Sequence, residues 1–317
     1  MKAAIVTSFG AVPEYGDFQD PASAEGESVV AVTAAPLSPI VKGLAAGRHY
    51  ASGKTAGFVP GVDGVGVDPT GRRVYFLFPK APFGSMAQKA LVASDMLVPV
   101  PDDLPDDRAA AIATAGLASW VALTRRARLR AGETVLVTGA TGAAGRMALG
   151  VARHLGAARV VAVGRDGKRL AALDADRRIA LEGEDADRAL RAEFDRGVDV
   201  VLDFVWGAPA GRVLKAAAAD RGSRAGEPRL RYVQLGTVAG DEIALRGDLL
   251  RSSGLELLGS GIGSVSVKDL LAGAGELLAA APAAGFAPPF IAVPLDAVAA
   301  AWDGDPRVRY IVQPDRG

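Results

Sequence analysis

A glycine-rich turn between a strand pattern and a helix pattern limits the folds open to this 317-residue chain. The run Thr134–Thr138 is short, apolar and β-branched, and Arg146–His154 follows it with helical spacing. Between them stand Gly139, Gly142 and Gly145. The first glycine permits a tight turn, the second lets the backbone approach a pyrophosphate, and the third lets the helix pack on the strand. The pattern predicts a βαβ unit in which the start of the helix binds a dinucleotide. The alternative is a turn of the same shape that binds no ligand.

The alternation of strand and helix patterns continues along the chain and predicts an α/β fold. We expect further strands at Arg159–Val163, Val198–Phe204, Leu230–Leu235 and Glu256–Leu258, and helices at Lys168–Leu173 and Val267–Ala281. Such spacing is typical of a parallel sheet covered by helices on both faces.

The first part of the chain has a different pattern. Up to about residue 115 it is rich in Gly and Pro, with short β-like runs at Ala3–Val6, Val29–Thr33, Arg73–Phe78 and Leu97–Val100. This is typical of an irregular β-barrel domain. The tail, with patterns at Phe290–Val293, Leu295–Trp302 and Arg309–Val312, is interpreted as a return to that domain. We therefore expect residues 1–115 and 256–317 in the barrel-like domain and 116–255 in the nucleotide-binding domain.

Composition excludes several functional classes. Lys plus Arg (36) balance Asp plus Glu (36), so no global positive field favours nucleic acid. The absence of cysteine excludes disulfides, Cys-ligated zinc and a thiol nucleophile, and only two histidines are present. The N-terminal segment lacks the apolar region of a secretory signal, and no apolar run is long enough for a membrane span. We expect a cytoplasmic protein without metal, membrane or nucleic-acid partners.

The end of the second strand of the nucleotide domain predicts which nicotinamide cofactor is bound. An NAD site has Asp or Glu there, to accept hydrogen bonds from the ribose. This chain has Gly164 and Arg165, with Lys168 and Arg169 just beyond. A guanidinium suits a 2′-phosphate, and Asp166 comes one position too late to replace the acidic residue. The sequence therefore predicts NADPH; an exposed charge at a helix start is the alternative for Arg165.

Several motifs together resemble a known family. They are Val59–Gly66, Gly116–Trp120, Gly132–Val137, the glycine-rich turn Thr138–Gly145, called the glycine loop from here on, and Leu235–Thr237. The chain is similar to the zinc-independent branch of the medium-chain dehydrogenase/reductase family, the quinone oxidoreductase-like members. The resemblance implies a Rossmann-type NADPH domain, a GroES-like barrel catalytic domain and a homodimer. Where zinc-bearing relatives carry Gly-His-Glu, this chain has Gly61-Val62-Asp63, which removes their alcohol dehydrogenase chemistry.

The motifs and the resemblance together nominate site residues. The expected cofactor contacts, besides Gly164, Arg165 and Lys168, are Thr141, Gly142, Ala143, Ala144, Phe204, Trp206, Leu235, Gly236, Thr237 and Arg309. The alternative for Trp206 is that it packs in the core instead of contacting the cofactor. The expected catalytic residues are Tyr50, which would hydrogen-bond the substrate oxygen, together with Ser38 and His49. The alternative to a catalytic role is that Tyr50 is part of a packed lid and that His49 is an exposed loop residue.

The expected reaction is hydride transfer to an electrophilic acceptor. Without zinc to polarise a carbonyl, quinones and other α,β-unsaturated carbonyl compounds are favoured over simple ketones. Two alternatives stay open: an enoyl-type tailoring reductase of a biosynthetic pathway, and a nucleotide-binding protein with little catalysis. The second rests on the loop Ser38-Pro39-Ile40-Val41, since relatives often show Asn-Pro-x-Asp there.

Overall fold

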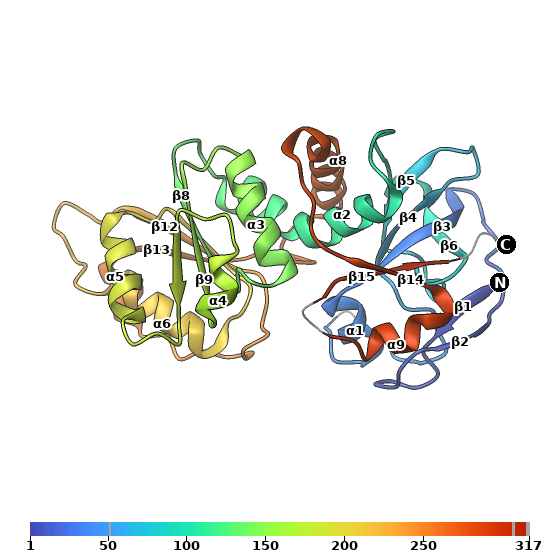
Figure 1. Cartoon of the computed structure of the whole chain (residues 1–317), viewed down its shortest axis with the longest axis horizontal. Coiled ribbons are helices and arrows are strands. Elements are labelled where there is room, and N and C mark those ends of the chain that lie inside the picture. The colour runs from blue at the N-terminus through green and yellow to red at the C-terminus, as the bar shows by residue number, and fades with distance from the viewer. Residues whose placement is uncertain (51, 306–307, 315–317) are drawn as a thin grey trace. The chain divides into compact units, whose positions relative to one another are not determined.

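The computed structural model describes residues 1–50, 52–305 and 308–314. Its internal contacts divide the chain into two compact units, one of Met1–Thr114 with Leu271–Gly317 and one of Ala115–Leu270 (Figure 1). The chain passes from one unit to the other within helix α2 (Asp106–Val121) and returns within helix α8 (Val267–Ala284). Among the described residues, no helix combines the length and the apolarity that crossing a membrane requires.

The second unit is built on a six-stranded parallel sheet in the order β10-β9-β8-β11-β12-β13. Its strands are β8 (Thr134–Thr138), β9 (Arg159–Gly164), β10 (Arg177–Ala180), β11 (Val200–Asp203), β12 (Arg229–Gln234) and β13 (Gly254–Gly259). Its helices are α3 (Ala143–His154), α4 (Gly167–Ala171), α5 (Ala186–Arg196), α6 (Gly207–Ala218) and α7 (Gly247–Ser252), after a π-helical turn η2 (Ala122–Ala127). The α/β fold expected from the strand-helix alternation is confirmed.

Helices on both faces explain why the central strands are apolar throughout. In Figure 1, α3 and α4 lie on one side of the sheet and α5 and α6 on the other. Strand β9 is buried along Val160–Gly164, as a strand covered on both faces must be. Helix α5 packs on the sheet through Leu190 and Phe194, which share one face of the helix with the buried Ala186 at a spacing of four residues.

The strand order reverses between β8 and β11, and this switch point lies at the carboxyl edge of the sheet. Counting from β8, the strands run outward through β9 and β10 on one side and through β11, β12 and β13 on the other. In register, Thr138 lies beside Val163 and Asp203, Asp203 lies beside Gln234, and Gln234 beside Gly259. These residues form a row at the edge where open α/β sheets bind ligands.

The first unit contains a mixed sheet of seven strands, ordered β14-β15-β3-β4-β5-β7 with β6 also on β3. The strands are β3 (Glu27–Leu37), β4 (Asp63–Val67), β5 (Arg73–Leu77), β6 (Lys89–Ala93), β7 (Leu97–Pro99), β14 (Ile291–Pro294) and β15 (Tyr310–Gln313), besides a hairpin of β1 (Lys2–Ile5) and β2 (Glu14–Asp17). Its short helices are α1 (Pro39–Ala45), η1 (Ser94–Met96), η3 (Leu295–Ala297) and α9 (Val298–Trp302).

The expected barrel is an open sheet in the described part of the chain, because its end strands β14 and β7 do not pair with each other. The long strand β3 changes partner along its length: Glu27–Ala31 pairs with β6 and Ala35–Leu37 with β15. A register shift between Val32 and Ala34 bends it between these partners. The unit's apolar core lies between this sheet and the segments around Met86 and Val298.

The expected boundary at residue 256 differs from the position at which the units divide. Strand β13 pairs with β12 along its whole length, from Gly254 beside Arg229 to Gly259 beside Gln234. It therefore completes the parallel sheet instead of opening the return to the first unit, and the second unit extends to Leu270. The return begins inside α8.

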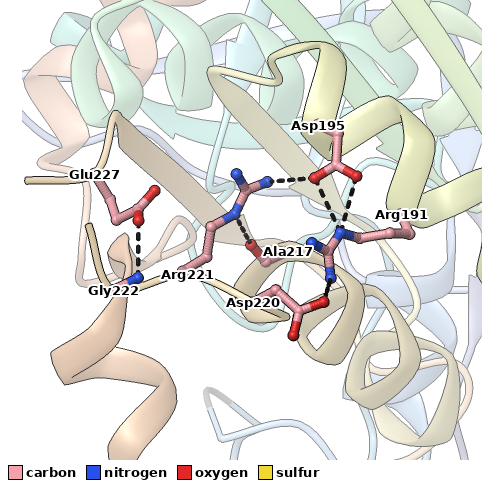
Figure 2. Close-up of polar contacts among 7 residues, drawn as sticks. All are labelled: Arg191, Asp195, Ala217, Asp220, Arg221, Gly222 and Glu227. Atoms are coloured by element: carbon pink, nitrogen blue, oxygen red, sulfur yellow. Dashed lines mark hydrogen bonds and ion pairs between the residues drawn. The ribbon is translucent and has the colours of Figure 1, made fainter.

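A surface network stabilises the long connection between α6 and β12 (Figure 2). The Arg191 guanidinium on α5 contacts Asp195 one turn later at 2.9 Å and Asp220 at 3.0 Å, and Arg221 reaches the same Asp195 at 3.3 Å. Glu227 accepts from the backbone N–H groups of residues 222 and 223 at 2.8 Å each. Exposed ion pairs of this kind contribute little individually, about 0–1 kcal/mol, but several share Asp195 and Arg191.

Candidate functional site

The glycine loop is shaped by positions that no other residue could occupy without a shift. Gly139 has φ +64°, and a Cβ there would lie 2.8 Å from Val205 Cγ1. A Cβ on Gly145 would lie 2.3 Å from the Gly139 carbonyl oxygen, so α3 packs directly against the turn. Gly142 caps α3, which begins at Ala143. The N–H groups of this first turn lie at the carboxyl edge of β8, so the loop fits the phosphates of a dinucleotide.

Cationic side chains follow β9, beside the glycine loop. Arg165 and Lys168 are exposed, whereas Arg169 is half-buried and donates from Nη2 to the carbonyl oxygen of Thr141 at 3.2 Å. Asp166 caps α4, accepting from the backbone N–H of Lys168 at 2.8 Å. The carboxylate is therefore engaged in starting a helix, and the end of β9 presents positive charge to a ligand of the loop.

The turn after β11 contains Phe204 and Trp206, two of the expected cofactor contacts. It is held by the side chain of Asp203, which is fully buried. Its Oδ1 accepts from the backbone N–H groups of Val205 at 3.0 Å and Trp206 at 3.2 Å and from the Thr138 hydroxyl. Its Oδ2 accepts from the Tyr232 hydroxyl at 2.8 Å. Phe204 and Trp206 are half-buried and precede α6, whose N-cap is Trp206, beside the glycine loop.

The end of β12 lies against the same turn. The backbone N–H groups of Leu235 and Gly236 donate to the carbonyl oxygen of Asp203, at 2.7 and 3.2 Å. A Cβ on Gly236 would lie 2.6 Å from the Phe204 carbonyl oxygen, so a glycine is needed for this approach. Beyond Leu235 and Gly236, a hollow of about 360 Å³ is lined by Trp206, Gln234, Thr237, Asp241, Leu257, Leu258 and Gly259. The structure thus brings together the expected cofactor residues of the second unit along one edge of its sheet.

The expected catalytic residues lie in the first unit, around α1. Tyr50 is 74% exposed, and its ring stacks on that of His49 with centroids 4.1 Å apart. Burial lowers the pKa of His49. Ser38 precedes α1 and is buried, and its hydroxyl has no hydrogen-bond partner within the described ranges.

Arg309, expected as a cofactor contact, is buried in the first unit and is engaged there. Its Nη1 donates to the Leu37 carbonyl oxygen at 3.2 Å, and it interacts electrostatically with Asp63. Burial lowers the pKa of Arg309. Burial also raises the pKa of Asp63 to about 7, although Asp63 accepts a hydrogen bond from the Tyr75 hydroxyl at 3.0 Å, which acts in the opposite direction. Arg309 thus supports the strand end that leads to Ser38.

Two residues of the site lie outside the set nominated from the sequence. Arg169 adjoins the nominated Lys168, and its position at a helix start after β9 was the available signal for a contact with the glycine loop. Asp203 ends an apolar strand, and an acidic residue at the carboxyl end of a β-strand in an α/β pattern is a signal that could have been used.

Comparisons with known proteins agree with the observed fold. A probable NADPH-dependent quinone reductase of Emericella nidulans is 32% identical over 316 residues, covering 86% of this chain and 87% of the relative. The solved quinone oxidoreductase of Thermus thermophilus, also determined as its complex with NADPH, has a TM-score of 0.80 at 27% identity, over 99% of this chain and 100% of that one.

A partial match is to a much larger protein. A phenolphthiocerol/phthiocerol polyketide synthase of Mycobacterium tuberculosis is 33% identical over 204 residues, which are 62% of this chain and 9% of the synthase. No protein-family model matches the chain. The full-length relative, the superposed quinone oxidoreductase and the motifs agree, and the chain belongs to the medium-chain dehydrogenase/reductase family, among its quinone oxidoreductase-like members.

Proposed function

We propose that this protein is an NADPH-dependent oxidoreductase that transfers a hydride to a quinone or another α,β-unsaturated carbonyl compound without a metal. The observation that carries the proposal is the glycine loop of β8 with the cationic end of β9 beside it. The N–H groups before and within the first turn of α3 suit a pyrophosphate, and Arg165 suits a 2′-phosphate. Relatives named as quinone reductases or oxidoreductases support the same activity.

Each part of the cofactor has its own set of residues. Thr141, Gly142, Ala143 and Ala144 would hold the pyrophosphate through their backbone, and Gly164, Arg165 and Lys168 the phosphorylated ribose. Phe204, Trp206, Leu235, Gly236 and Thr237 would flank the nicotinamide half. Arg309 supports the strand end at Ser38, since its buried guanidinium donates to Leu37.

The chemistry asked of the side chains is modest. When bound, NADPH supplies the hydride, so the chain's own task is to orient the reactants and to stabilise the charge that develops on the acceptor oxygen. Tyr50 would donate a hydrogen bond to that oxygen, with His49 stacked against its ring and Ser38 as a further hydroxyl. Because the chain has no cysteine and has Val62 where zinc-bearing relatives have histidine, we propose that no metal assists.

A specific observation favours a second candidate function. The match to a polyketide synthase covers 62% of this chain at 33% identity. An enoyl-type tailoring reductase would use the same cofactor site and would differ only in the acceptor. A nucleotide-binding protein with little catalysis is the third interpretation, because the loop at Ser38 lacks the Asn and Asp of relatives.

The proposal extends to assembly and compartment. We propose a homodimer in the cytoplasm, without nucleic-acid or membrane partners. Strand β13 ends the parallel sheet and, among the described residues, pairs only with β12, so that its free edge suits the pairing of two sheets. The equal numbers of acidic and basic residues give no global field for polyanions.

Turnover against a panel of acceptors tests the proposal. Purified protein is given NADPH with ortho-quinones, para-quinones, enones and an enoyl thioester, and cofactor oxidation is followed. Faster oxidation with quinones than with the other acceptors is expected. A clear preference for the enoyl thioester would support the second candidate, and binding of NADPH without oxidation by any acceptor would support the third.

A further inference from the structure

We propose that Asp203 is a positioning residue, whose buried carboxylate holds the segments that flank the nicotinamide half of the cofactor. The inference rests on the proposed function and goes beyond it, because Asp203 is fully buried and acts only through the residues that it binds. Several segments meet at this side chain, it stabilises a strained backbone, and its contacts belong to one half of the site.

Segments from three neighbouring strands meet at Asp203. The Thr138 hydroxyl at the end of β8 donates to Oδ1 and accepts from the backbone N–H of Phe204 at 3.2 Å. The Tyr232 hydroxyl on β12 donates to Oδ2 at 2.8 Å. The residue's own carbonyl oxygen accepts from Leu235 and Gly236 beyond the end of β12. One residue thereby connects the start of the glycine loop, the β11 turn and the end of β12.

The carboxylate also stabilises a strained backbone. Trp206 has φ +54° and ψ −157°, a combination that residues other than glycine rarely adopt. Such a conformation costs free energy and persists only where its surroundings determine it, which happens preferentially at ligand sites. Asp203 Oδ1 accepts the Trp206 N–H at 3.2 Å. The Trp206 ring also meets the Tyr232 ring edge-on, with centroids 6.4 Å apart, and Asp203 fixes the Tyr232 hydroxyl.

The position in the sheet defines which half of the cofactor site depends on Asp203. The cationic residues after β9 are on the other side of β8 and, among the described contacts, donate no hydrogen bond to this carboxylate. Trp206 bonds to the carboxylate directly and Phe204 through the Thr138 hydroxyl. Loss of the carboxylate should therefore loosen the nicotinamide half of the site and leave the half for the 2′-phosphate and adenosine intact.

The experiment compares two ligands that differ in which half they occupy. Adenosine 2′,5′-bisphosphate carries the adenosine, the 2′-phosphate and one further phosphate, whereas NADPH occupies both halves. Dissociation constants for each are measured by calorimetry on the full chain and on Asp203→Ala. We expect NADPH to bind about tenfold more weakly or worse, because several hydrogen bonds to a charged group are lost. The bisphosphate should stay within about twofold, a split that general destabilisation would not produce.

A second variant and a matched control keep the test decisive. Thr138→Val keeps the shape of the side chain and removes the hydroxyl that links Asp203 to Phe204, and it should show the same split if Asp203→Ala fails to fold. Asp199→Ala removes a carboxylate just before the same strand, at the opposite edge of the sheet, where it accepts from the Thr134 N–H at 2.8 Å. It should leave both constants within about twofold.

The outcomes separate this inference from the proposed function. If the parent binds both ligands and the variants that fold, either both or Thr138→Val alone, bind NADPH as the parent does, the positioning role is overturned. Equal weakening of both ligands in the two variants also overturns it. If the parent protein binds neither ligand, the proposed function fails first.

Discussion

Replacing Asp63 by Asn should make the stability of the protein less dependent on pH. Burial raises the pKa of the Asp63 carboxyl from 3.8 to about 7, despite the opposing hydrogen bond from Tyr75 and the charge of Arg309. The folded state therefore holds this proton more tightly than the unfolded state does. The resulting stability is fully present below about pH 4 and is lost as the pH rises through about 7. A rise from 3.8 to about 7 corresponds to about 4 kcal/mol of unfolding free energy.

The assay is urea unfolding of the parent and of Asp63→Asn at several values between about pH 4 and pH 8. The amide has the shape of the carboxyl, can still accept from the Tyr75 hydroxyl and does not titrate. The unfolding free energy of the variant minus that of the parent should increase by about 4 kcal/mol over this interval and then level. Taking the difference removes the contribution of the groups that both proteins share. A difference that does not change with pH would show that the folded state does not hold this proton.

Asp68 directly follows the last residue of β4 and serves as a control, because its pKa is shifted in the opposite direction to that of Asp63. Burial raises the pKa of its carboxyl, but hydrogen bonds from Thr70 and Arg72 outweigh this effect and lower the pKa to about 2. Its contribution is present above about pH 4 and is lost only as the pH falls through about 2. The difference between Asp68→Asn and the parent should therefore stay constant between about pH 5 and pH 8.

Further predictions concern the site. Arg165→Ala should weaken NADPH binding about tenfold or more, since a charge-assisted phosphate contact contributes about 1.5–3 kcal/mol, and should leave NADH binding within about twofold; unchanged NADPH affinity in a titration would contradict the assignment. Tyr50→Phe should lower turnover about tenfold, less than the 10²–10³ of buried donors, because the side chain is 74% exposed. A turnover number within about twofold of the parent would make Tyr50 a lid residue. Activity should survive dialysis against EDTA; stoichiometric zinc in the purified protein would contradict metal-free catalysis.

The parallel sheet could be predicted where the sequence pattern and the burial agree. The strand expected at Thr134–Thr138 is β8 with the same bounds, because a strand buried on both faces is an uninterrupted apolar run. Strand β10 was missed, since it lies at the edge of the sheet and its Arg-Arg-Ile-Ala sequence buries little besides Ile179. Strand β4 was also missed because its glycines indicate a turn. Gly64 is there for packing, as a Cβ would lie 2.7 Å from the Phe76 ring.

The candidate site, too, could be predicted from the sequence only in part. The glycine loop and Arg165 are contiguous in sequence with the strands that present them, so their pattern could be interpreted locally. The role of Asp203 depends on Thr138 and Tyr232, which are 65 and 29 residues away along the chain. The acidic residue at the end of β11 is a local signal, but no local pattern identifies these partners, because they come together only when three strands are placed side by side. The contact of the buried Arg309 with the Leu37 carbonyl oxygen likewise joins residues that lie 272 positions apart along the chain.

The activity proposed for this protein is the reduction of an electrophilic carbonyl acceptor with NADPH. The decisive measurement is kcat/KM for NADPH and for NADH, each with the best quinone of the acceptor panel, in the same buffer. We predict oxidation of both cofactors with a preference for NADPH of about tenfold or more, in line with the phosphate contact of Arg165. Equal values for the two cofactors would contradict the preference for NADPH, and no oxidation of NADPH with any quinone or enone would contradict the proposed activity.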